Sequence, residues 1–179
     1  RLRDEFWESF DPADKRTELI VREYVNNAGD TINLLPPADN VRPFKYWPGG
    51  DFAGPAYGND IPVIRYSDIL LSRAEALNEL NGPTQEALDL INLVRQRAEV
   101  PNLELSNFAD QAALRDHILA ERGWEFWYEE KRRDDLVRHG KLISLAQDRG
   151  QPAQPHHVRY PIPQFALDAN PLLVQNEGY

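Results

Sequence analysis

The sequence predicts a mainly α-helical fold in which a pair of antiparallel helices is accompanied by long loops and an irregular, proline-rich tail. Three observations favour this class. Helical periodicity of apolar residues begins near residue 61, turn-forming residues recur throughout the preceding segment, and five prolines interrupt the chain after residue 150. We therefore distinguish a loop-rich segment, residues 1–60, from a C-terminal helical domain, residues 61–179, and expect the segment to belong to the same domain.

The loop-rich segment is recognised by its turn and breaker residues. Pairs such as Asp11-Pro12, Pro36-Pro37 and Gly54-Pro55 exclude long regular elements there. Short extended pieces fit between these breakers at residues 18–24 and 41–47, so we expect one hairpin at most.

Two helices are predicted next, over residues 63–81 and 84–98. Each has one apolar stripe of helical period, formed by Tyr66, Leu70, Ala74 and Leu77 in the first and by Ala87, Ile91, Val94 and Ala98 in the second. Asn81-Gly82-Pro83 ends the first helix and opens the second. The pair resembles a single tetratricopeptide-type repeat, whose helices bury small residues on their facing sides.

A third helix is expected over residues 110–129 with Asn107 as its N-cap, and a shorter fourth over residues 132–139 that ends at Gly140. Beyond Ala146 the periodicity is lost. We expect an irregular tail there, with one short helical turn near residues 164–168.

Composition excludes several classes of function. The formal net charge is −9 and the pI is about 4.9, with no basic stripe, so nucleic acid is not an expected partner. Cysteine is absent, which excludes disulfides, thiolate zinc sites and cysteine nucleophiles. No apolar run approaches the roughly 20 residues that span a bilayer. The chain opens at Arg1 without a signal-like segment, so we expect it to begin inside a larger protein.

Four stretches carry a resemblance to a known family. They read IPVIRYSDILL at residues 61–71, INLVRQRA at 91–98, ILAERGWEF at 118–126 with DLVR at 135–138, and YPIP at 160–163 followed by NPL and QNEGY at 170–172 and 175–179. In order, spacing and terminal position they resemble the SusD/RagB family of outer-membrane nutrient-binding proteins. Residues Arg133 and Asp134 occupy positions where that family usually has rings, which would loosen packing or reshape a surface.

The resemblance implies a SusD-like helical fold and a binding function without enzymatic activity or cofactor. Members of the family are lipid-anchored at the cell surface on the outer membrane, cap a SusC-like TonB-dependent transporter, and capture an oligosaccharide or, less often, a peptide. By this resemblance the anchor would lie in an N-terminal region outside the present sequence.

A structural ion-pair network is predicted on the third helix. Glu121, Glu125 and Glu129 continue the stripe of Leu114 and Ile118, and buried carboxylates need cationic partners. The expected partners are arginines, foremost Arg65, Arg95 and Arg132, with Arg97, Arg122 and Arg133 also near. The alternative is a catalytic carboxylate pair formed by Glu121 and Glu125, as glycoside hydrolysis requires.

Ligand-binding candidates lie in the loop-rich segment. Sugars stack on aromatic faces and hydrogen-bond to planar polar groups, and the richest such stretch contains Arg42, Tyr46, Trp47, Phe52 and Tyr57. The competing interpretation is that these rings pack against the helices, as we expect for Trp124, Trp127 and Tyr128. His156-His157 lacks a third ligand at suitable spacing, so we expect a solvated pair and no metal site.

Three function classes therefore follow from the sequence: a glycan-binding or peptide-binding subunit of a surface uptake complex, a glycan-active enzyme of the same utilisation system, and a tetratricopeptide-like scaffold that binds protein. The first is favoured because no catalytic constellation other than the glutamate pair is apparent. The third is disfavoured because such arrays generally need about three repeats.

Overall fold

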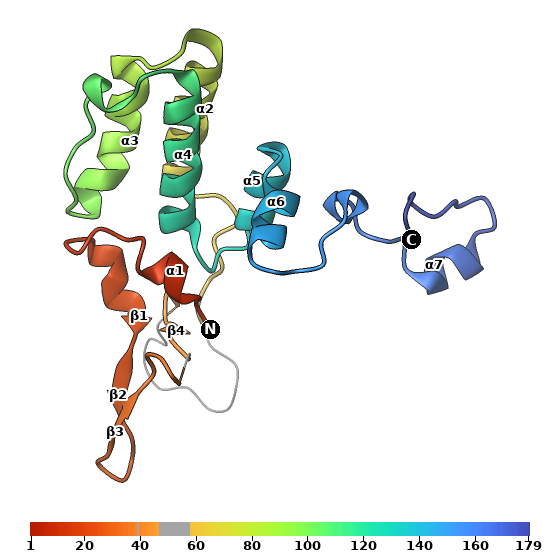
Figure 1. Ribbon diagram of the computed structural model, residues 1–179, viewed down its shortest axis with the longest axis horizontal. Coiled ribbons are helices and arrows are strands. Elements are labelled where there is room, and N and C mark those ends of the chain that lie inside the picture. The colour runs from red at the N-terminus through yellow and green to blue at the C-terminus, as the bar shows by residue number, and fades with distance from the viewer. Residues whose placement is uncertain (39, 47–57) are drawn as a thin grey trace. The chain divides into compact units, whose positions relative to one another are not determined.

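The computed structural model describes residues 1–38, 40–46 and 58–179 (Figure 1). The chain divides into two compact units, Arg1–Glu129 and Glu130–Tyr179. Helices dominate both units, so the prediction of a mainly helical chain is confirmed. The sequence division at residue 60 marks where helical periodicity begins and lies inside the first unit.

Three helices form the frame of the first unit: α2 (Tyr66–Asn81), α3 (Gln85–Arg97) and α4 (Gln111–Phe126). The predicted helical hairpin is present in α2 and α3, and α4 packs beside it (Figure 1). Gly82 has a φ of 74°, a backbone conformation that favours glycine and allows the tight stop after α2.

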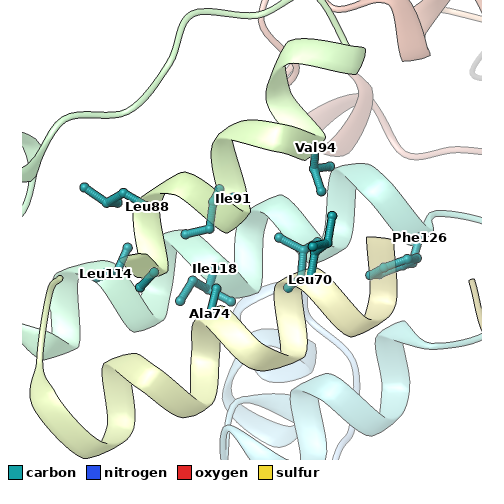
Figure 2. Close-up of a cluster of buried hydrophobic side chains, with 10 residues drawn as sticks. Leu70, Ala74, Leu88, Ile91, Val94, Leu114, Ile118 and Phe126 are labelled. Carbon is teal, nitrogen blue, oxygen red and sulfur yellow. The ribbon is translucent and has the colours of Figure 1, made fainter. Parts of the chain in front are cut away.

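Apolar side chains from all three helices meet in one buried cluster, shown in Figure 2. Its members include Leu70 and Ala74 of α2, Ile91 of α3, and Leu114 and Ile118 of α4. The helical spacing predicted these inward positions. Tyr66 is the exception, because it begins α2 and its side chain is 72% exposed.

Side-chain amides fix α4 against the end of α2. Asn78 Nδ2 donates to the carbonyl oxygen of Gln111 at 2.9 Å, while Gln111 Nε2 donates to the carbonyl oxygens of Asn78 at 2.7 Å and Glu79 at 2.9 Å. Helix termini leave backbone carbonyls without helical partners. Gln111 Nε2 thereby provides a partner for the Glu79 carbonyl oxygen near the end of α2.

The boundaries of the third helix differ from the prediction. Asp110 is the N-cap, since its carboxylate accepts from the Ala113 backbone N–H at 2.8 Å. Asn107 instead ends the short 3-10 turn Leu105–Asn107, where its side chain accepts from the backbone N–H of the N-cap Glu104 at 2.8 Å. The helix stops at Phe126 because Trp127 has extended backbone and Tyr128 has a φ of 63°. Helical spacing alone did not reveal the left-handed conformation of Tyr128.

The loop-rich segment is more structured than expected. It contains the short helix α1 (Asp4–Trp7), a 3-10 turn (Lys15–Leu19) and four strands: β1 (Ile20–Val21), β2 (Glu23–Val25), β3 (Thr31–Asn33) and β4 (Arg42–Pro43). β2 and β3 form an antiparallel hairpin, and β1 pairs with β4, also antiparallel. The expected extended pieces contain β1 and β4, whereas β3 was not predicted. The extended piece predicted from residue 18 was wrong at its start, because Glu18 and Leu19 belong to the 3-10 turn.

A second apolar cluster joins this segment to the end of the helical frame. Phe10, Ile20 and Val41 pack with Trp127, whose side chain is 4% exposed. Trp127 is therefore core, as expected, and Trp124 packs against the same cluster. Tyr128 is not core, since its side chain is 61% exposed.

The second unit contains α5 (Arg132–Arg138), α6 (Leu142–Asp148), the 3-10 turn Pro155–Val158 and α7 (Gln164–Ala169). The fourth helix and the turn near residue 164 were predicted, whereas α6 was not. Gly140, with a φ of 65°, separates α5 from α6.

Side-chain hydrogen bonds from the QNEGY stretch, residues 175–179, hold the C-terminal end of the second unit against residues 159–162. The side-chain amide of Gln175 accepts from the Ile162 backbone N–H at 2.8 Å and donates to the Ile162 carbonyl oxygen at 2.9 Å. Tyr179 Oη donates to the Arg159 carbonyl oxygen at 2.7 Å. His156 packs edge-on against the Tyr179 ring at 4.8 Å. The two histidines are thus half-buried against Tyr179 and not a freely solvated pair.

Candidate functional site

Charged side chains gather around the C-terminal half of α4. We call this set the buried charge cluster; its carboxylates are Asp14, Glu121, Glu125 and Glu129, and its cations are Arg16, Lys45, Arg65, Arg95 and Arg97. The side chains of Glu121 and Glu125 are completely inaccessible to solvent. Charges so deeply buried require close partners.

Glu121 has one arginine for each carboxylate oxygen. Arg16 Nη1 lies 2.9 Å from Oε1 and Arg95 Nη1 lies 2.8 Å from Oε2. Arg95 is held in place by donating from Nε to the Pro101 carbonyl oxygen at 2.8 Å. The carboxylate therefore links the segment before β1 to α3.

Glu125 is the most densely paired carboxylate. Its Oε1 accepts from Arg65, and its Oε2 accepts from Arg97 and, at 3.2 Å, from Arg16 Nη1. Burial alone would raise the pKa of this carboxyl, but the charges of Arg65, Arg97 and Arg16 outweigh it and hold the pKa below its ordinary value. Glu125 is accordingly ionised at neutral pH.

Glu129 lies beyond the end of α4, yet its side chain turns back into the cluster. Arg65 donates to both of its oxygens at 2.8 Å, and Lys45 forms an ion pair with it. Burial would raise the pKa of Glu129, and the hydrogen bonds from Arg65 and Lys45 lower it more. Lys45 Nζ also donates to the Glu125 carbonyl oxygen at 2.6 Å.

Arg16 and Lys45 were not among the partners that sequence reasoning named. Arg16 is positioned by Asp14, whose carboxylate accepts from its Nη2 at 2.6 Å and caps the 3-10 turn through the Arg16 backbone N–H. The signal was present in the run Asp14-Lys15-Arg16-Thr17 after Asp11-Pro12. No helical periodicity connected that run to α4, so the pairing could not be read from spacing.

The arrangement of Glu121 and Glu125 is unsuited to acid–base chemistry. Each of their four carboxylate oxygens lies within hydrogen-bonding distance of a guanidinium group. A general acid needs a raised pKa and access to its substrate, whereas Glu125 has a lowered pKa and no exposed surface. The geometry favours a structural role over the hydrolase alternative.

Of the predicted ligand-binding residues, the structure describes Tyr46 and Arg42. Tyr46 lines a pocket of about 270 Å³ together with Lys45, Arg97 and Trp127, and its ring lies 6.3 Å from that of Tyr128. Arg42 is exposed on β4, where its Nε donates to the Asn40 carbonyl oxygen at 3.2 Å. Trp47, Phe52 and Tyr57 lie outside the described residues.

The second unit contains the remaining candidates. Arg132 begins α5. Arg133, at one of the two ring positions, lies 3.9 Å from the Tyr160 ring centroid and donates to the His157 carbonyl oxygen at 3.1 Å, so a cation replaces ring packing there. Asp134 is exposed.

Across residues 1–38, 40–46 and 58–179, no three metal-binding side chains converge on one point, and no helix combines the length and apolarity of a membrane span.

Comparison with known proteins places these features in context. Residues 53–179 match the model of the SusD family. A SusD-like protein, P25, from Formosa agariphila is 40% identical over 129 residues, which are 65% of this chain and 24% of that protein. The starch-binding protein SusD of Bacteroides thetaiotaomicron is 30% identical over 128 residues, 67% of this chain and 22% of that protein. The chain thus spans about a quarter of the length of these relatives.

Solved structures are similar over almost the whole chain. A surface glycan-binding protein A from Bacteroides thetaiotaomicron, in complex with laminarihexaose, aligns with a TM-score of 0.69 and 25% identity over 97% of this chain and 40% of that one. A SusD superfamily protein from Bacteroides vulgatus aligns with a TM-score of 0.72 and 21% identity, covering 98% of this chain and 43% of the other, and supports the fold alone.

Proposed function

Because this chain belongs to the SusD family, we propose that it is part of a cell-surface nutrient-binding protein whose ligand is a glycan. The observation that carries the proposal is the alignment of 97% of the chain with a surface glycan-binding protein whose structure is solved in complex with laminarihexaose. The similarity to a starch-binding protein points to the same ligand class. A peptide ligand is the second candidate within this function.

The finer elements of the proposal concern partner and location. We propose that the protein acts with a SusC-like TonB-dependent transporter, and that it is lipid-anchored at the outer membrane through a region that precedes the present sequence in a longer protein. Both follow from family resemblance. Protease treatment of intact cells, and co-purification with a tagged transporter of this type, would test them; protection from protease and failure to co-purify would contradict them.

The buried charge cluster supports a binding role over an enzymatic one. Its carboxylates are enclosed by arginines and serve, in our proposal, to hold the loop-rich segment on the helical frame. Loops held rigidly on a helical scaffold are where binding residues commonly concentrate. In this proposal the cluster organises a binding surface, and Lys45, Arg65 and Arg97 also line the pocket that contains Tyr46.

The central experiment measures binding and turnover on the same sample. The chain is titrated with laminarihexaose, maltohexaose and a hexapeptide panel by isothermal titration calorimetry, and separately incubated with the parent polysaccharides while reducing ends are assayed. We expect saturable binding to at least one oligosaccharide and no release of reducing ends. Release of reducing ends would favour the enzyme, and binding confined to peptides would favour the second candidate.

A further inference from the structure

A second pocket of about 290 Å³ lies within the first unit, between α1 and β1. Its wall includes Trp7, Phe10 and Ile20 as apolar surface and Glu8, Asp11 and Arg22 as charged groups. None of these residues was a candidate from the sequence, because they are spread over sixteen positions with no common period. The fold brings them together through the turn that precedes β1.

The charged groups of this pocket differ from those of the buried charge cluster. Within the part of the chain that the structure describes, neither Glu8 nor Arg22 takes part in an ion pair, and both side chains are exposed. Asp11 Oδ1 accepts from the Ala13 backbone N–H at 2.9 Å, and the second carboxylate oxygen, Oδ2, is left to accept from a ligand. Hydrogen-bonding capacity therefore remains for a ligand here, whereas all four carboxylate oxygens of Glu121 and Glu125 already accept from guanidinium groups.

The aromatic wall is held in position. Trp7 Nε1 donates to Asp4 Oδ1 at 2.9 Å, which fixes the polar edge of the indole, and the Arg22 guanidinium lies 6.0 Å from its ring centroid, so the ring and this cation line the pocket together. Phe10 is buried, packs edge-on against Phe6 at 5.3 Å, and lies 6.0 Å below the guanidinium of Arg16. A wall fixed in this way loses little side-chain entropy when a ligand binds.

An aromatic face beside two carboxylates and a guanidinium matches the chemistry of a sugar ring. The C–H face of a pyranose packs on an indole, its hydroxyl groups donate to carboxylates, and its oxygens accept from a guanidinium. Phosphorylated or acidic ligands fit less well, because Glu8 and Asp11 repel them and the chain carries a formal charge of −9. The volume lies near the lower limit of roughly 300 Å³ for ligand pockets, which suits a single ring of a longer chain.

We propose that this pocket, with Trp7 as its platform and Glu8, Asp11 and Arg22 as its hydrogen-bonding groups, is a subsite for one neutral pyranose residue of a glycan. The proposal rests on the glycan-binding function proposed above and assigns residues to it. It places a binding site on the described part of the loop-rich segment, away from Tyr46 in sequence and in a different pocket.

The test titrates the whole chain and five variants with laminarihexaose and maltohexaose, with a lysine-containing hexapeptide as the competing ligand. Trp7→Ala is expected to weaken oligosaccharide binding at least tenfold, while Trp7→Phe, which keeps a ring, stays within about threefold. Arg22→Ala is expected to weaken binding three- to tenfold. Tyr24→Ala is the matched control, since Tyr24 is an exposed aromatic residue on β2, the next strand along the chain, and does not line the pocket.

Each result has a distinct meaning. Binding by the unmodified chain that survives Trp7→Ala and Arg22→Ala within twofold overturns the subsite and leaves the proposed function standing. Failure of the unmodified chain to bind either oligosaccharide contradicts the proposed function itself. If the chain binds the peptide and Trp7→Ala abolishes that binding, the pocket accepts a cationic side chain and not a sugar. If Trp7→Ala lowers the melting temperature strongly, the outcome is decided by the oligosaccharide affinities of Arg22→Ala and Glu8→Gln. Both substitutions are at exposed positions.

Discussion

Arg16 and Glu121 are 105 residues apart in the chain, and their side chains meet at 2.9 Å inside the first unit. The arginine comes from a turn of the loop-rich segment and the glutamate from the middle of α4. Their contact, with that of Arg16 and Glu125, makes the position of the segment depend on the charge state of one helix.

Substitution of Glu125 by glutamine tests the centre of the buried charge cluster. Glutamine keeps the shape but removes the charge, so Arg65, Arg97 and Arg16 lose a shared carboxylate. Breaking a buried pair in this way typically costs about 3–5 kcal/mol. We expect a loss of that size in urea denaturation. The control is Glu86→Gln, which removes an exposed pair with Arg73 and should cost less than about 1 kcal/mol; equal effects would contradict the structural role.

The stability of the first unit is expected to fall in acid. The pKa values of Glu125 and Glu129 lie below the ordinary value of 4.5 in the folded protein, so the folded state binds fewer protons than the unfolded state near and below that pH. Their contribution is therefore complete at neutral pH and is lost as pH decreases from about 4.5 through the folded pKa values. Denaturation midpoints measured between pH 7 and pH 3 check this. In Glu125→Gln the decline should be shallower, and a parallel decline would show that other groups are responsible.

Arg16→Met tests the attachment of the loop-rich segment. The change leaves Asp14 and one oxygen of Glu121 without a cation, and we expect a destabilisation of about 3–5 kcal/mol. Amide hydrogen exchange should accelerate first in residues 14–21, before α2 and α3 are affected. Arg3→Met, at an exposed position, is the matched control and should leave exchange unchanged. Uniform acceleration across all helices would argue against local attachment.

Gly178→Ala tests the closure of the second unit. Gly178 has a φ of 97°, and an added Cβ would lie 2.4 Å from His156 Cγ, so both backbone strain and a clash are expected. Gly150→Ala is the control, because Gly150 has a φ of 71° but nothing within 4 Å of its added Cβ. The control should cost about 1–2 kcal/mol from the backbone alone. We expect Gly178→Ala to cost more and to shift the NMR signals of His156 and Tyr179, and equal costs would show that the packing is loose.

Local periodicity accounts for what the sequence predicted correctly in the fold. The apolar stripes of α2, α3 and α4 and the stop at Asn81-Gly82-Pro83 depend only on neighbouring residues, and they identified both the helices and most of their inward positions. Errors arose where backbone conformation departs from a regular pattern. The left-handed conformation of Tyr128 ends α4 earlier than predicted, and no turn-forming residue at that point of the sequence indicated the end of the helix.

The candidate site shows the same division. The inward side of Glu121 and Glu125 followed from helical spacing, whereas Arg16 and Lys45 come from irregular segments whose place in space is set by tertiary packing. The pocket at Trp7 was missed for that reason also. Its members share neither a helix nor a strand, so only the folded chain assembles them.

The exchange of hydrogen bonds between Asn78 and Gln111 has a mechanical consequence. A displacement of α4 along α2 by one helical turn, about 5.4 Å, would break all three of these bonds together, since each uses a backbone carbonyl near one helix end. Such bonds resist a pulling force in parallel and not one after another. Under tension along α4, the two helices should therefore hold their register up to a threshold and then separate in a single step, without sliding.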